Sequence, residues 1–200
     1  MQNLLKISAV IDAINERVGQ VVKWFILAAV LVSTVNAIIR KLFNVSSNSW
    51  LELQWYLFGA VFMLGAAYTF LKNEHIRIDI VTSNFTKRTR DRIDVFGHIF
   101  FLVPFTWIMI YHGLPFFYRS FAIGESSMNA GGLTVWPAKA LLPLGFILLL
   151  IQGISELIKR IAIMRGDMED PHVFVGHHGA AEAEAERLLQ AAQADIPGRN

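Results

Sequence analysis

The sequence predicts an all-α integral membrane protein: four transmembrane helices, preceded by an amphipathic interfacial helix and followed by a flexible C-terminal tail. Of its 200 residues, 54% are hydrophobic. The apolar residues gather in four segments long enough to cross a bilayer, which takes about 20 residues in a helix. These segments also lack the polar stripe that a helix of a soluble protein carries.

Residues 1–19 are predicted to form an amphipathic helix lying in the membrane interface. The apolar residues of this segment fall on one helical face, and Asp12 and Glu16 lie away from it. The two acids also interrupt the segment where a secretory signal peptide would have a continuous apolar core. The alternative is that the segment simply continues the first span as one longer helix.

The membrane domain is predicted over residues 20–165. Its second span contains no charged residue, and Lys23 lies at the start of the first span, where a lysine can reach the membrane surface. The four spans are expected at about residues 20–40, 53–71, 95–117 and 135–158.

Lysine and arginine residues predict the orientation of the spans. The loop between the second and third spans holds six of them: Lys72, Arg77, Lys87, Arg88, Arg90 and Arg92. Cytoplasmic loops are rich in Lys and Arg, so we expect this loop and both termini in the cytoplasm and residues 41–50 and 113–134 outside. The tail, residues 166–200, is polar and broken by Pro and Gly, and is expected to be flexible.

The distribution of charge and the absence of cysteine exclude several functions. A formal net charge of +2 gives no support for a nucleic-acid partner. Without cysteine, thiolate metal sites and iron–sulfur clusters are impossible. No acid or base lies near the middle of a span, where ion and proton pathways place them, and no internal repeat is visible. Transport by this chain alone is therefore not expected.

A membrane cytochrome or electron-transfer anchor is the alternative function. His98 and His112 both lie on the third span. Their separation corresponds to about 21 Å along a helix, so they cannot bind the same haem, and the other spans contain no histidine. Polar groups within spans more often bond a neighbouring helix than a cofactor. We therefore expect no cofactor, no metal site and no catalytic residue.

Small residues at helical spacing indicate close contacts between helices. Such residues let two backbones approach, and a buried amide such as Gln152 can bond across the contact. These faces could pack the spans on each other or receive a larger membrane partner, and the sequence leaves both open. The small residues are Ala29, Ser33, Ala37, Gly65, Gly145 and Gly153.

A short charged segment follows the second span. In "NEHIRIDIV", residues 73–81, His75, Arg77 and Asp79 alternate with isoleucines. A metal site here would need closing ligands that the sequence does not offer. We therefore interpret the segment as a cytoplasmic elbow in which Arg77 and Asp79 pair with each other or with nearby backbone.

The segment that enters the fourth span has its own turn signals. Gly131 and Gly132 give a flexible turn. Pro137 suits the first turn of the fourth helix, where a missing N–H has no cost. Pro143 lies deeper and is expected to kink the helix or to leave a carbonyl without its partner.

Three stretches together resemble the small membrane subunit of tripartite ATP-independent periplasmic (TRAP) transporters, the DctQ-like small permease family. They are "SWLELQWYLFGAVFMLGAAYTF" at 49–70, "NEHIRIDIV" at 73–81 and "GESSMNAGGLTVWPAKALLPLGFILLLIQGISELIKRI" at 124–161. The family has an acid opening the second span, a His-x-Arg-x-Asp elbow, and a Trp-Pro-x-Lys-x-x-x-Pro segment. The matching positions are Glu52, His75, Arg77, Asp79, Trp136, Pro137, Lys139 and Pro143.

The resemblance implies a transporter subunit of the bacterial inner membrane and not an enzyme. Such transporters import organic acids with a sodium gradient. A periplasmic solute-binding protein delivers the solute, a large permease subunit carries it across, and the small subunit braces that permease among membrane lipids. The matched positions, together with Glu125, Ser126, Gly131, Gly132 and Gln152, are then expected to be structural or to contact partners. The solute itself would be chosen by the partner proteins.

Overall fold

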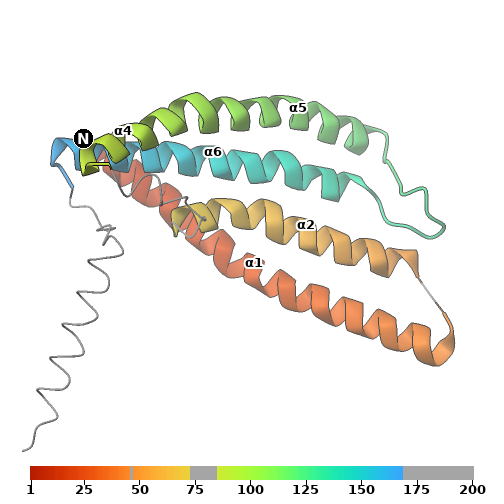
Figure 1. Ribbon diagram of the computed structural model, residues 1–200. Helices are drawn as coiled ribbons and strands as arrows, with labels where there is room; N and C mark the ends of the chain where they lie inside the picture. Colours follow the sequence, from red (N-terminus) through yellow and green to blue (C-terminus); the bar gives the residue numbers. More distant parts are fainter. Residues whose placement is uncertain (46, 73–84, 169–200) are drawn as a thin grey trace, which may run out of the picture.

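The protein is all-helical, as predicted (Figure 1). The computed structural model describes residues 1–45, 47–72 and 85–168. Their elements are α1 (Gln2–Phe43), α2 (Asn48–Leu71), α4 (Lys87–Gly97), the π-helical turn η1 (His98–Leu102), α5 (Val103–Ala122) and α6 (Trp136–Arg165). Elements α4, η1 and α5 follow one another without a break. Among the described residues, four helices are therefore long and apolar enough to cross a membrane, and they contain the four predicted spans to within one residue.

The four long helices lie side by side in the order α1, α2, α6, α5 (Figure 1). Helix α1 packs on α2, α2 on α6, and α6 on α5, while α1 also contacts α6. Such a layer buries little. In the span with the best-covered apolar window, only 28% of that window is buried. Most of the apolar surface therefore faces outward, where lipid or another protein can cover it.

Helix α1 contains both the N-terminal amphipathic segment and the first span. Residues 1–19 and the span lie on one helix that runs unbroken from Gln2 to Phe43, which is the alternative given by the sequence analysis. The glycine at the expected boundary, Gly19, instead permits a close contact with α2: a Cβ atom there would lie 2.3 Å from the Tyr68 ring. The segment is amphipathic as expected, with Ile7 and Ile14 exposed.

The π-helical turn has its cause in Pro104. Proline has no N–H, so the carbonyl of Phe100 lacks its usual donor four residues later, and the ring crowds that carbonyl. The ladder widens just before the proline: the Val103 N–H bonds to the His98 carbonyl, five residues back. The Thr106 hydroxyl then donates to the Leu102 carbonyl at 2.8 Å. The third span is thus one helix with a local irregularity in the part that follows α4.

Helix α6 begins and ends as its sequence suggests. Pro137 lies in its first turn, and Gly166 ends it with a φ of 79°, a conformation that favours glycine. The helix continues through Pro143, which is buried. Pro143 lies against Gly113 of α5, where an added Cβ would be 3.5 Å from the proline ring.

Candidate functional site

The carboxylate of Glu52 organises the end of the layer at which α2 and α6 begin. Glu52 lies in the second turn of α2 and is only 4% exposed. Its Oε1 accepts hydrogen bonds from the Ser127 hydroxyl and from the Asn129 amide, the latter at 2.8 Å. Its Oε2 accepts from the backbone N–H of Leu133 at 2.6 Å. Bonds to an ionised acceptor are roughly twice as strong as neutral ones, so Glu52 fixes three points of one loop.

That loop, residues 125–135, is named here the outer hairpin, after the orientation that the sequence predicts. Ser126 and Thr134 form an antiparallel bridge, and the N–H of Ser127 bonds to the Leu133 carbonyl at 2.9 Å. At the turn, Gly131 has a φ of 70°. A Cβ at Gly132 would lie 2.5 Å from that of Ser127 and 2.9 Å from Glu52 Oε1. Both glycines that the sequence singled out are therefore required by the geometry of this turn.

Three further hydrogen bonds join the first part of α2 to the outer hairpin. The Asn48 amide donates to the Ala130 carbonyl at 3.0 Å. The Ser49 hydroxyl donates to the Gly131 carbonyl. The Tyr56 hydroxyl donates to the Thr134 carbonyl at 3.1 Å. Together with Glu52, these bonds leave the hairpin little freedom relative to α2.

The base of the outer hairpin is closed by an ion pair. Lys139 Nζ lies 2.5 Å from Glu125 Oε2 and 4.4 Å from the centre of the Phe116 ring. The Lys139 ammonium holds the pKa of the Glu125 carboxyl below its ordinary value. Trp136 packs beside them, with its ring centre 5.3 Å from that of Phe121 on α5. The hairpin is thereby tied to α5 and α6 as well as to α2.

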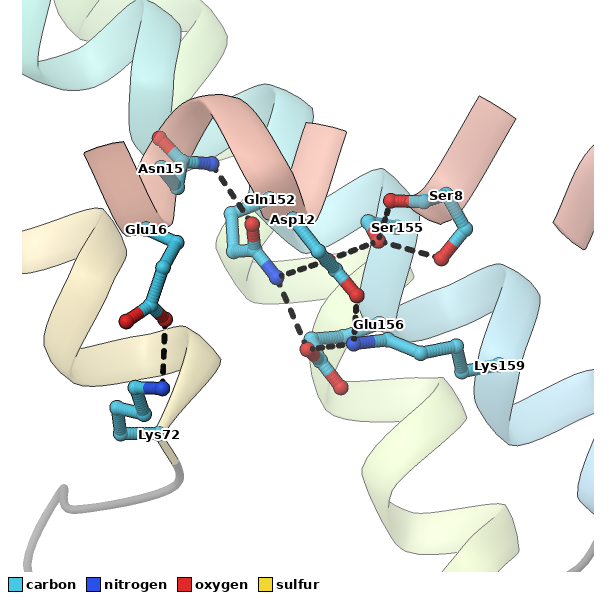
Figure 2. Close-up of polar contacts among 9 residues, drawn as sticks. All are labelled: Ser8, Asp12, Asn15, Glu16, Lys72, Gln152, Ser155, Glu156 and Lys159. Atoms are coloured by element: carbon cyan, nitrogen blue, oxygen red, sulfur yellow. Dashed lines mark hydrogen bonds and ion pairs between the residues drawn. The ribbon is translucent and has the colours of Figure 1, made fainter. Parts of the chain in front are cut away.

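A second polar cluster holds the other end of the layer together (Figure 2). Asn15 on α1 and Gln152 on α6 are both fully buried, and the Asn15 amide donates to Gln152 Oε1 at 2.7 Å. Gln152 in turn donates to Asp12 at 3.0 Å and to Glu156 at 3.0 Å. Lys159 Nζ lies 3.0 Å from Asp12 Oδ2. The N-terminal part of α1 is thus bonded to α6 through a connected network.

This second cluster is named here the inner cluster, after the predicted orientation, and consists of Ser8, Asp12, Asn15, Gln152, Ser155, Glu156 and Lys159. Further bonds extend it to the neighbouring helices. Ser8 and Ser155 share a hydrogen bond of 2.7 Å between buried hydroxyls. Lys72 at the end of α2 pairs with Glu16 at 2.5 Å. Arg160 on α6 binds Asp91 at 3.1 Å and Asp94 at 3.0 Å, both on α4. All four long helices are therefore connected at this end.

The structure brings together most of the site residues that the sequence indicated. Glu52, Glu125, Ser126, Gly131, Gly132, Trp136 and Lys139 meet at the outer hairpin, as the contacts above describe. Gln152 lies in the inner cluster, and Pro143 lies between the two clusters on α6. His75, Arg77 and Asp79 lie outside the described residues, so the elbow stays a prediction.

Sequence reasoning missed the α1 half of the inner cluster. Ser8, Asp12, Asn15 and Gly19 are spaced like one face of a helix, which was a usable signal. An interfacial helix would turn this polar face to water, whereas Ser8 and Asn15 are buried against α6. An amphipathic pattern shows that two faces differ, but not which of them meets protein.

The small residues mostly serve contacts within the chain. A Cβ at Gly145 would lie 2.6 Å from the backbone oxygen of Met63, and one at Gly153 would lie 2.6 Å from the Leu102 side chain. Ala29 is fully buried, and a Cβ at Gly65 would lie 3.9 Å from Val22. Ser33 is half-buried and Ala37 is exposed. The part of the α1 stripe nearest Phe43 is therefore the part that the described residues of this chain cover least.

One haem candidate has a bond within its own helix. His98 Nδ1 lies 2.5 Å from the Asp94 carbonyl, while His112 is exposed on α5. Within residues 1–45, 47–72 and 85–168, no three His, Cys, Asp or Glu side chains gather as metal ligands would. The buried polar groups Asn15 and Gln152 instead bond one helix to another.

Comparison with known proteins adds one match. The family model described as "Tripartite ATP-independent periplasmic transporters, DctQ component" matches residues 29–162. The matched region covers about two thirds of the 200 residues. It includes the outer hairpin and the α6 half of the inner cluster, but not Asp12 or Asn15. A search among curated proteins finds no significant match.

Proposed function

The chain belongs to the family of DctQ components of tripartite ATP-independent periplasmic transporters, and from this premise we propose that it braces the large permease subunit during sodium-driven import of an organic acid. As a family member it is a small permease subunit and a multi-pass protein of the inner membrane. The family is one of transporter components and not an enzyme family, and it does not favour the cytochrome alternative.

The exposed faces of the helix layer carry this proposal. A self-contained four-helix bundle buries a common core, whereas here even an inner helix of the layer keeps large side chains outside. Helix α2 lies between α1 and α6, yet Trp55 is 64% exposed and Phe62 is 77% exposed. Broad apolar faces on a layer that is bonded firmly at both ends suit a support for a larger membrane protein.

The position of the charged residues supports a brace and not a carrier. No Asp, Glu, Lys or Arg occurs in residues 24–39, 53–71, 95–118 or 140–155. Ionisable groups deep in a membrane mark ion and proton pathways. The charges that the structure describes on these helices lie outside these four stretches, where Glu52 bonds the outer hairpin and Lys159 bonds Asp12 of α1.

Reconstitution in liposomes tests the proposal. We expect uptake of radiolabelled organic acids, from a panel presented with the purified solute-binding protein, only when this chain and the large permease are both present under an inward sodium gradient. Replacing sodium with choline should abolish uptake. Accumulation by this chain alone, or full activity of the large permease without it, would contradict the bracing role.

A further inference from the structure

We propose that the outer hairpin is the part of this subunit that receives the soluble solute-binding protein, through Met128 at its turn and Arg119 at the end of α5. The inference rests on the proposed function and on the orientation predicted from the sequence, which places this end of the layer outside the cytoplasm. It adds a specific surface and a specific chemistry of recognition to that function.

The first support is that the outer hairpin is held in one shape. Glu52 bonds it at Ser127, Asn129 and Leu133, and Asn48 bonds it at Ala130. The Glu125–Lys139 pair closes its base. A loop that only connected α5 to α6 would not need so many bonds. A surface that is already ordered loses less conformational entropy when a partner binds.

The second support is what this held loop presents. Met128 is fully exposed, with a relative accessibility of 105%, and Ile123 just after α5 is 74% exposed. On the spans, lipid or the large permease can cover exposed apolar residues, but the outer hairpin extends past the ends of α5 and α6 (Figure 1). An unbranched methionine adapts its shape to a partner, as at other protein-binding surfaces. An apolar contact beyond the helix ends therefore indicates a protein partner.

The third support is the charge of this end of the molecule. Its two acids, Glu52 and Glu125, are both bonded within the chain, Glu52 to the outer hairpin and Glu125 to Lys139. Arg119, in the last turn of α5, is exposed. The outer hairpin and its surroundings therefore present positive charge beside an apolar contact. Complementarity then requires an acidic docking face on the partner.

Photo-crosslinking in the complete transporter tests the contact. The assembly of small and large subunits, embedded in nanodiscs, would carry a benzophenone amino acid in place of Met128. The matched control places the same group at Val45, which is 58% exposed at the other outer loop. With purified solute-binding protein added, we expect a crosslink from position 128 and none from position 45. A crosslink from position 128 to lipid or to the large permease alone, or no crosslink, would overturn the inference.

Charge reversal tests the electrostatic part. Arg119→Glu should slow uptake by about fivefold or more at limiting solute-binding protein, and the loss should shrink as salt rises, because exposed interfacial charges act mainly on association. Arg40→Glu is the matched control, since Arg40 is exposed at the end of α1, apart from the hairpin (Figure 1). Equal losses in both variants, or no loss at Arg119, would contradict the inference.

Failure of this inference is distinguishable from failure of the proposed function. Co-purification of the large permease with the unaltered chain tests the proposed function. If the large permease co-purifies and neither position 128 nor Arg119 affects the solute-binding protein, only the docking surface is wrong.

Discussion

Burial separates two kinds of carboxylate in this molecule. Glu52 is 4% exposed and accepts three hydrogen bonds from the outer hairpin. Glu16 pairs with Lys72 at 2.5 Å, but the two side chains are 36% and 39% exposed. An exposed pair is worth about 0–1 kcal/mol. A buried donor that loses its acceptor costs about 1–3 kcal/mol, so Glu52 should matter more than Glu16.

Glu52→Gln should therefore destabilise the protein by about 1–3 kcal/mol. The glutamine NH₂ must face at least one of the donors that now point at Glu52, from Ser127, Asn129 or Leu133. Thermal unfolding of the purified chain in detergent measures the effect. Glu16→Gln is the matched control and should lower the unfolding temperature by less, because its pair with Lys72 is partly exposed to solvent. Equal shifts in the two variants would show that the outer hairpin does not depend on Glu52.

The Glu125–Lys139 pair gives a prediction about pH. Lys139 lowers the pKa of Glu125 in the folded protein. The stabilisation is thus fully present above the ordinary glutamate pKa of about 4.3 and is lost as the pH falls through the lowered folded value. The difference in unfolding temperature between the unaltered chain and Glu125→Gln should be constant from neutral pH to about pH 5.5 and shrink below it. A difference that grows on acidification would contradict this assignment.

At the scale of the helices, local pattern identified the elements but not all of their partners. Hydropathy located the four spans, because each is a continuous property of its own residues. The bond between Asn15 and Gln152 joins positions 137 residues apart, and no local pattern records such a pairing. The sequence indicates Glu52 as an acid that opens the second span, but its hydrogen-bond donors, such as Asn129, lie 77 residues away. The glycines of the outer hairpin were predictable because a tight turn is a local requirement.

Two glycines of α6 test how the helices approach each other. At Gly145 an added Cβ would meet the backbone of Met63, which cannot move aside, whereas at Gly153 it would meet the end of the flexible Leu102 side chain. Gly145→Ala should therefore destabilise by about 1–3 kcal/mol, and Gly153→Ala by less. Ala37→Leu, at an exposed position of α1, is the control and should leave the unfolding temperature of the isolated chain unchanged. A larger destabilisation by Gly153→Ala than by Gly145→Ala would contradict the α2–α6 packing.

At the scale of the whole molecule, the layer has two unlike ends. One end carries the outer hairpin, where Glu52 of α2 and Glu125 are both bonded to groups of the same chain. The other end carries the inner cluster and α4, whose first residues include Arg88, Arg90 and Arg92. A layer with apolar faces and polar ends fits a bilayer in only two orientations. The excess of Lys and Arg at the α4 end favours the orientation in which that end is cytoplasmic.

Cysteine labelling of intact cells decides between the two orientations. The chain contains no cysteine, so one introduced residue gives an unambiguous signal. Met128 and Val45 are exposed at one end of the layer, and Arg88 is exposed at the other. None of the three takes part in the bonds that hold the outer hairpin or the inner cluster. We expect a membrane-impermeant thiol reagent to label Met128→Cys and Val45→Cys in intact cells, and to label Arg88→Cys only after the membrane is opened. Labelling of position 88 alone in intact cells would reverse the orientation, place both termini outside, and remove the outer hairpin from the side on which a periplasmic partner could reach it.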